Sequence, residues 1–83
     1  MNNRITFKRL EKILKELGFR KKIVPDSCVT YSHPPTKALL IVRLHKPDDL
    51  VPGYVIIAAR LELEWKGILE PKSFEAMLQS AAA

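Results

Sequence analysis

The 83-residue sequence contains a single cysteine, Cys28, and no long apolar run. One thiol builds neither a disulfide framework nor a cysteine-based metal site, and it fits a reducing compartment. No apolar run approaches the ~18 residues that a membrane-spanning helix needs. The first residues lead directly into an amphipathic pattern, which predicts that there is no signal peptide. We therefore expect a cytoplasmic protein with no membrane partner.

The usual motifs of cofactor sites are missing as well. The sequence has no glycine-rich phosphate loop and no Ser-His-Asp constellation. Its acidic residues offer no metal-ligand spacing, because Glu62 and Glu64 stand two apart on a predicted helix and do not share a face. We predict neither a cofactor nor a metal site.

Composition indicates a globular domain with a basic surface. Apolar residues make up 47% and charged residues 28% of the chain, a balance that excludes wholesale disorder. The net charge is +5 at neutral pH, which suggests a polyanionic partner without proving one. Because the chain shows no internal repeat and no linker, we predict one domain over residues 1–79 and a disordered tail over residues 80–83.

Hydrophobic periodicity predicts two long helices and a short one. The first covers residues 7–17, with Thr6 as its N-cap and Gly18 after its end. The second covers residues 52–66, and a short third helix covers residues 71–78. The predicted buried stripe of the second helix is Tyr54, Ile57, Ala58, Leu61 and Trp65.

Three runs between the first two helices predict strands. Residues 19–24, 27–33 and 38–44 are rich in β-branched and aromatic residues and are separated by turn residues. The third run is nearly all apolar, which predicts a central strand. The sequence therefore predicts an α+β two-layer sandwich of order α-β-β-β-α-α, with a three-stranded antiparallel sheet and helices on one face.

Short sequence motifs along residues 6–67 resemble those of the HicA (YcfA-like) family of small bacterial toxins. The motifs are Leu10–Phe19, in which Gly-Phe follows the predicted helix, Asp26-Ser27-Cys28 in place of Gly-Ser-His, Tyr31-Ser32-His33-Pro34, Val42-Arg43-Leu44-His45 and Gly53. The resemblance implies a toxin-antitoxin mRNA interferase, an endoribonuclease whose fold is like that of double-stranded-RNA-binding domains. It also implies a HicB-like antitoxin that covers the basic surface.

The departures from the family concern the chemistry. The histidine credited with RNA cleavage in the family is replaced by Cys28, which the resemblance places beside Ser27 at the former active site. A free thiol is mostly protonated at neutral pH and replaces an imidazole poorly in proton transfer. Cys28 is therefore a candidate catalytic residue, and the alternative is a small, half-buried strand residue.

The two histidines do not obviously replace the missing imidazole. His33 is five residues from Cys28 on the same predicted strand, and an odd separation places the two on opposite faces. His45 follows the third predicted strand, beside Lys46, where it either contacts a phosphate or is solvated.

Basic residues supply the candidate RNA-binding surface. The first helix carries lysines at i, i+4 and i+7, which form one stripe. Lys21 points to the opposite face of its strand from Arg20 and Lys22, so these three do not share one patch. The alternative is a solvated face that acidic neighbours partly neutralise. The candidate residues are Lys8, Lys12, Lys15, Arg20, Lys22, Lys37, His45 and Lys46.

Three functional hypotheses follow. The first is a HicA-like RNA-binding protein, either a weak or an inactivated mRNA interferase. The second is a non-catalytic protein-interaction module with no nucleic-acid role, in which Phe74, Met77 and Leu78 pack onto the core or onto a partner. The third is an active ribonuclease that uses Cys28. We expect a monomer or a weak homo-oligomer.

Overall fold

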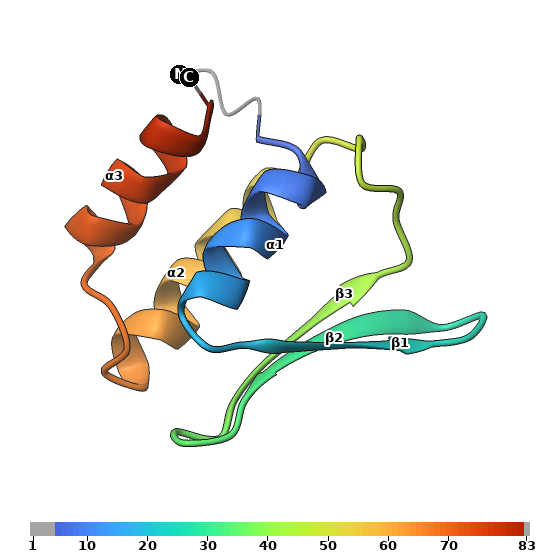
Figure 1. Cartoon of the computed structure of the whole chain (residues 1–83), viewed down its shortest axis with the longest axis horizontal. Helices are drawn as coiled ribbons and strands as arrows, with labels where there is room; N and C mark the ends of the chain where they lie inside the picture. Colours follow the sequence, from blue (N-terminus) through green and yellow to red (C-terminus); the bar gives the residue numbers. More distant parts are fainter. Residues whose placement is uncertain (1–4, 83) are drawn as a thin grey trace.

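The computed structural model describes residues 5–82, and its six elements form two layers (Figure 1). The three helices lie on one side of a three-stranded antiparallel sheet, as the sequence predicted. No helix within these residues combines the length and the apolar content required to cross a membrane. The elements are α1 (Phe7–Glu16), β1 (Arg20–Val24), β2 (Cys28–His33), β3 (Ala38–Arg43), α2 (Gly53–Trp65) and α3 (Pro71–Ala82).

Helix α1 forms because its apolar residues recur on one face and both of its ends are capped. The Thr6 hydroxyl accepts a hydrogen bond from the Arg9 N–H at 3.4 Å, which satisfies one free donor of the first turn. Gly18 ends the helix in the left-handed region with φ of 96°, where a side chain is strained. Leu10 and Leu14, on the inward face of this helix, are almost completely buried.

The sheet has the order β1-β2-β3, so β2 is the central strand. The prediction that the third strand is central is wrong, because β3 lies at an edge. Its inward residue Leu40 is buried, whereas Leu39 and Ile41 on the other face are 48% and 60% exposed. The continuous apolar run in β3 therefore reflects an uncovered outer face rather than a central position.

Side chains bind the outward polar groups of the β3 edge at both ends. The Glu62 carboxylate, from α2, accepts a hydrogen bond from the Leu39 N–H at 3.0 Å. The His45 Nδ1 donates to the Arg43 carbonyl at 2.9 Å. These two contacts occupy groups that an incoming strand would otherwise use.

Helix α2 packs through a different face from the one predicted. It buries Val55, Ile56, Ala59 and Leu63. The whole predicted stripe is exposed instead, including Tyr54 at 66% and Trp65 at 82%. The prediction was wrong because α2 carries apolar residues on nearly every side, so periodicity alone does not select the inward face.

Helix α3 completes the core. Phe74 is fully buried and Leu78 is 8% exposed, and Met77 packs at the edge of the same cluster. The apolar residues of this helix therefore cover the core, not a partner. Where the sequence predicted a tail from residue 80, the helix continues to Ala82, and residue 83 lies outside the described residues.

Candidate nucleic-acid interface

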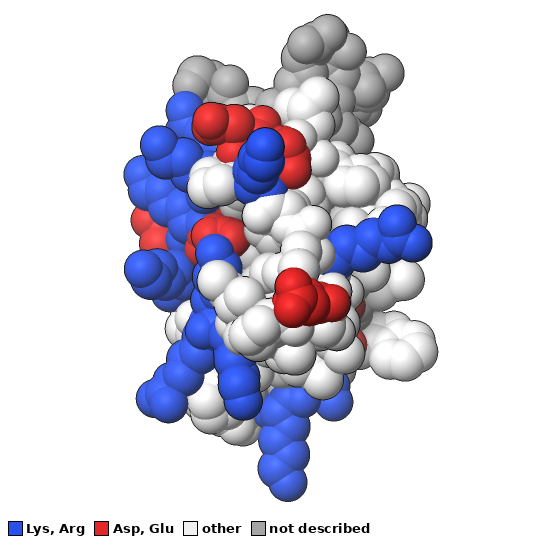
Figure 2. Space-filling model, turned by 90° about the vertical axis from the view of Figure 1, so that its right-hand side faces the viewer, with Lys and Arg blue, Asp and Glu red and all other residues white. Residues whose placement is uncertain are grey.

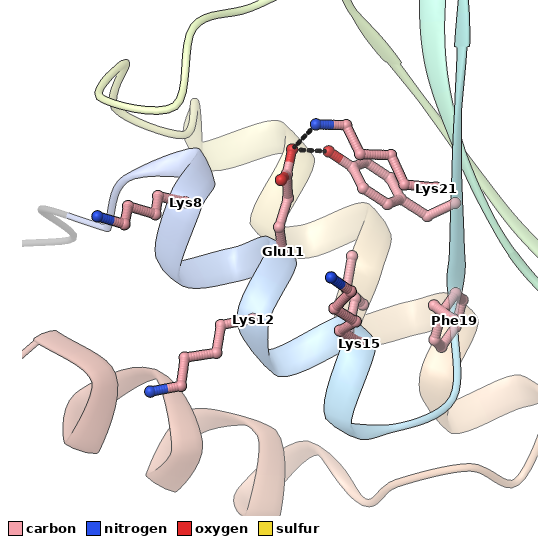
Figure 3. Close-up of a pocket in the computed structure, with 8 residues that line it drawn as sticks. Lys8, Glu11, Lys12, Lys15, Phe19 and Lys21 are labelled. Atoms are coloured by element: carbon pink, nitrogen blue, oxygen red, sulfur yellow. Dashed lines mark hydrogen bonds and ion pairs between the residues drawn. The ribbon is translucent and has the colours of Figure 1, made fainter.

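A groove of about 310 Å³ lies between α1 and the sheet. Four lysines line it, with Phe19 and Tyr31 among its apolar lining (Figure 3). The only acidic side chain in its lining is Glu11. The four lysines are Lys8, Lys12, Lys15 and Lys21, and we call them the groove lysines.

Two different elements position the groove lysines. Lys8, Lys12 and Lys15 follow the i, i+4, i+7 spacing of α1, and all three are exposed. Lys21 comes from β1, on the sheet face that the helices cover, because it pairs across the strands with buried Tyr31. Figure 3 shows Lys8 and Lys12 extending from the same side of α1, while Lys21 reaches from β1 to Glu11. In Figure 2, lysines and arginines gather mainly on one side of the view.

The carboxylate of Glu11 joins the helix to the sheet at the base of the groove. One oxygen, Oε2, accepts a hydrogen bond from the Tyr31 hydroxyl at 2.6 Å and lies 2.9 Å from the Lys21 Nζ. The His45 Nε2 lies 3.2 Å from the same oxygen. The structure therefore places two donors, the Tyr31 hydroxyl and the Lys21 ammonium, and one imidazole nitrogen around a carboxylate that is 23% exposed.

The electrostatics of this cluster fix the charge on Glu11 and on Tyr31. Burial raises the pKa of Glu11, but its contacts with Tyr31, Lys21 and His45 outweigh burial and hold that pKa below its usual value. Burial raises the pKa of Tyr31 strongly, and the neighbouring Glu11 carboxylate raises it further. Glu11 is thus an anion and Tyr31 a neutral donor at neutral pH, and neither is matched to proton transfer near pH 7.

The His45 side chain points into the interior of the protein. Its side chain is only 5% exposed, and its ring stacks on Phe7 with a centroid distance of 3.7 Å. Because the Arg43 carbonyl can only accept, Nδ1 carries the proton in that hydrogen bond. The reading of His45 as a solvated loop residue is wrong, and an imidazole buried in this way presents no free edge to a phosphate. The His45 Nε2 faces the Tyr31 hydroxyl at 3.3 Å and the Glu11 carboxylate at 3.2 Å.

The candidate catalytic residue lies on the other face of the sheet. Cys28 is half-buried at the start of β2, between Val24 and Arg43 on the neighbouring strands. Ser27 is exposed in the turn before it. His33 lies on the opposite face, as expected from its odd spacing, and its Nδ1 is 2.8 Å from the Thr36 hydroxyl. The sheet therefore separates Cys28 from the imidazoles of the chain.

The remaining predicted basic residues lie outside the groove. Arg20 and Lys22 share the outer sheet face with Cys28, according to the strand register. Lys37 stands in the turn between β2 and β3 with φ of 60°, and Lys46 in the loop after β3. The structure thus brings together the stripe of α1 but not the other predicted residues.

Sequence reasoning missed Lys21, Glu11 and Tyr31 as members of the site. The available signal was the strand alternation, which separates Lys21 from Arg20 and Lys22. That alternation identifies two faces but does not say which one the helices cover.

No group of three or more His, Cys, Asp or Glu side chains within residues 5–82 is arranged to hold a metal ion. No family model, curated protein or solved structure matches this chain. The proposed function therefore rests on the groove and the charged side chains that line it.

Proposed function

We propose that this protein is an RNA-binding domain that holds the phosphate backbone in the lysine groove and does not cleave it. The observation that carries the proposal is that lysines of both α1 and β1 line one hollow. Helical rise separates Lys8 from Lys15 by roughly 10 Å along α1. A row of cations of this length along one helix suits a phosphate backbone more than a single small anion.

The fold supports RNA as the polyanion. Double-stranded-RNA-binding domains contact phosphates with a helix face and loops on a two-layer α+β frame, and the present fold has the same general layout. The resemblance to the HicA family points in the same direction. Asp26, which stands at the position of a family glycine, has φ of 60°, a conformation that glycine adopts readily. A HicB-like antitoxin would then cover the groove.

The side chains at the site give little support for RNA cleavage. Metal-free RNA hydrolysis needs a base for the 2′-hydroxyl and an acid for the leaving oxygen, each working near neutral pH. Glu11 and Tyr31 stay in their anionic and neutral forms there. Cys28 lies across the sheet from the groove. We therefore propose a HicA-like domain that binds RNA but does not cleave it.

The test is the affinity for labelled double-stranded and single-stranded RNA as a function of salt. Binding through the groove lysines makes the logarithm of the affinity fall linearly with the logarithm of the salt concentration between about 50 and 200 mM. The double variant K12E/K15E should weaken binding at least about tenfold, since it reverses two phosphate contacts. The variant K66E/K72E makes the same change in net charge at exposed lysines outside the groove.

Equal losses in the two double variants would show that net charge alone attracts RNA. No RNA binding at low salt would overturn the proposal and favour the protein-interaction hypothesis. Cleavage without added metal would contradict the non-catalytic part of it.

A further inference from the structure

The outward face of α2 carries an uninterrupted apolar surface. It comprises the residues that the sequence predicted as buried, and we call them the α2 stripe: Tyr54, Ile57, Ala58, Leu61 and Trp65. The opposite face of the same helix is packed on the core. A helix that is apolar all round is normally covered on all sides, and a contiguous exposed apolar patch marks an interaction site.

The α2 stripe is continuous with further exposed apolar residues. Tyr54 shares a surface hollow with Leu44 and Leu50, which are 46% and 53% exposed. In Figure 2 the side away from most of the lysines is largely uncharged. None of the residues of the α2 stripe lines the lysine groove. The apolar surface and the basic groove are therefore separate features of one small domain.

We propose that the α2 stripe is a homodimer contact, in which two copies of this chain pair their α2 helices antiparallel about a twofold axis. The order of side chains along the helix fits this arrangement. Tyr54 and Trp65 are equally far from the midpoint between Ala59 and Arg60. Around a twofold axis through that midpoint, each aromatic ring meets the other aromatic of the second copy.

The same midpoint brings a small residue against a large one. Ala58 and Leu61 are also equally far from it, so Ala58 of one copy faces Leu61 of the other. Alternation of small and large residues lets two helix surfaces approach and interdigitate. The stripe contains no charged side chain, so pairing buries no unpaired charge.

The available area is sufficient for a weak dimer. An aromatic side chain buries about 150–250 Å², so Tyr54 and Trp65 provide most of an interface of roughly 500 Å² per copy. The total of roughly 1,000 Å² is at the lower limit for a specific interface. Pairing through the β3 edge is a poorer alternative, because Glu62 and His45 occupy its ends.

The experiment measures association by sedimentation and by tryptophan emission across a dilution series. Trp65 is the only tryptophan, and it is 82% exposed in the single chain. Its emission should shift to shorter wavelength as concentration rises through the micromolar range, together with the appearance of dimer. No RNA is required, so this result is independent of the groove.

Two isoleucines of similar exposure give matched variants. I57K places a charge in the α2 stripe and should weaken the dimer about 10- to 100-fold, since it removes one buried apolar side chain. I23K makes the same change on β1, where Ile23 is 56% exposed and Ile57 is 51% exposed. The dimer of I23K should be as strong as that of the unmodified chain, and both variants should keep the circular dichroism of the folded protein.

The register is tested by disulfide formation in a C28S background. A mixture of A58C and L61C chains should cross-link to a heterodimer. Y54C chains should not cross-link to each other, because the two copies of position 54 lie about 16 Å apart along the helix axis in this register. A protein that sediments as a monomer at all concentrations overturns the proposal. A dimer that I23K and I57K weaken equally also overturns it, as does an emission shift that appears only on adding lipid vesicles.

Discussion

The Tyr31 hydroxyl donates a 2.6 Å hydrogen bond to the Glu11 carboxylate, across the space between the central strand and α1. The Lys21 ammonium binds the same oxygen, and the His45 Nε2 lies 3.2 Å from it. Four segments that are distant in sequence therefore meet at one carboxylate: α1, β1, β2 and the loop after β3. This cluster fixes the spacing of the two walls of the lysine groove, so the stability of the fold and the shape of the candidate site depend on the same residues.

Replacing Tyr31 with phenylalanine should reduce the free energy of unfolding by about 1–3 kcal/mol, because it leaves a partly buried carboxylate without one of its donors. The change should appear as a lower urea midpoint. Y54F is the matched control, since Tyr54 is exposed and loses no hydrogen bond recorded in the structure. Equal effects of the two substitutions would contradict a structural role for the Tyr31 hydroxyl.

Acid should destabilise the fold through Glu11. Its pKa is lower in the folded state than the ordinary value of 4.5, so its stabilising contribution is present above that value and is lost as pH falls through the folded pKa. The free energy of unfolding should therefore decrease more between pH 7 and pH 3 in the unmodified protein than in E11Q. Parallel curves for the two proteins would argue against the lowered pKa.

The core contact of α3 can be tested with Phe74. F74A should cost about 3–5 kcal/mol of stability, because it empties a fully buried site. The neighbouring Glu75 is an exposed partner of Arg60 at 3.5 Å, and E75A should change stability by less than about 0.5 kcal/mol. Thermal or urea unfolding measures both. A small effect of F74A would mean that α3 is not part of the cooperative unit.

Lys21 and Lys22 are adjacent but lie on opposite sheet faces, which makes them a sharp test of the groove. K21Q should reduce the slope of RNA affinity against salt by up to about one, because the Lys21 ammonium is shared with the Glu11 carboxylate. K22Q should leave that slope unchanged, because Lys22 lies on the uncovered outer face. Anisotropy titrations at several salt concentrations would measure both slopes. The reverse result would place RNA on the outer face.

Introducing an imidazole at position 28 should not produce cleavage. C28H would place it on the outer face of the sheet, between Val24 and Arg43 and away from the groove. We expect unchanged RNA affinity and no products in a metal-free gel assay. Cleavage by C28H would show that RNA is processed on the outer face, and C28S is the control for loss of the thiol alone.

The sequence predicted α1 and its ends well because the signals there are local. The apolar spacing, the Thr6 cap and the Gly18 exit each depend on neighbouring residues only. The same reasoning failed for α2, where apolar residues occur on almost every side and two different faces satisfy a helical period. Packing against β3 and α3 chose the face that contains Ala59 and Leu63, and no local signal encodes that choice.

The candidate site was only partly predictable for a similar reason. The spacing of Lys8, Lys12 and Lys15 identified one wall of the groove. Glu11 and His45 are 34 residues apart, and their contact depends on the loop after β3 folding back onto α1. The role of His45 therefore followed from tertiary packing, which one sequence without its fold does not reveal.

The side chains that close the two ends of β3 have a consequence for the protein at high concentration. An apolar edge strand is a template on which further chains can add without limit. Here an added strand would first have to displace Glu62 from the Leu39 N–H and His45 from the Arg43 carbonyl. Open-ended growth into fibres is therefore opposed, whereas pairing about a twofold axis through α2 is complete at two copies.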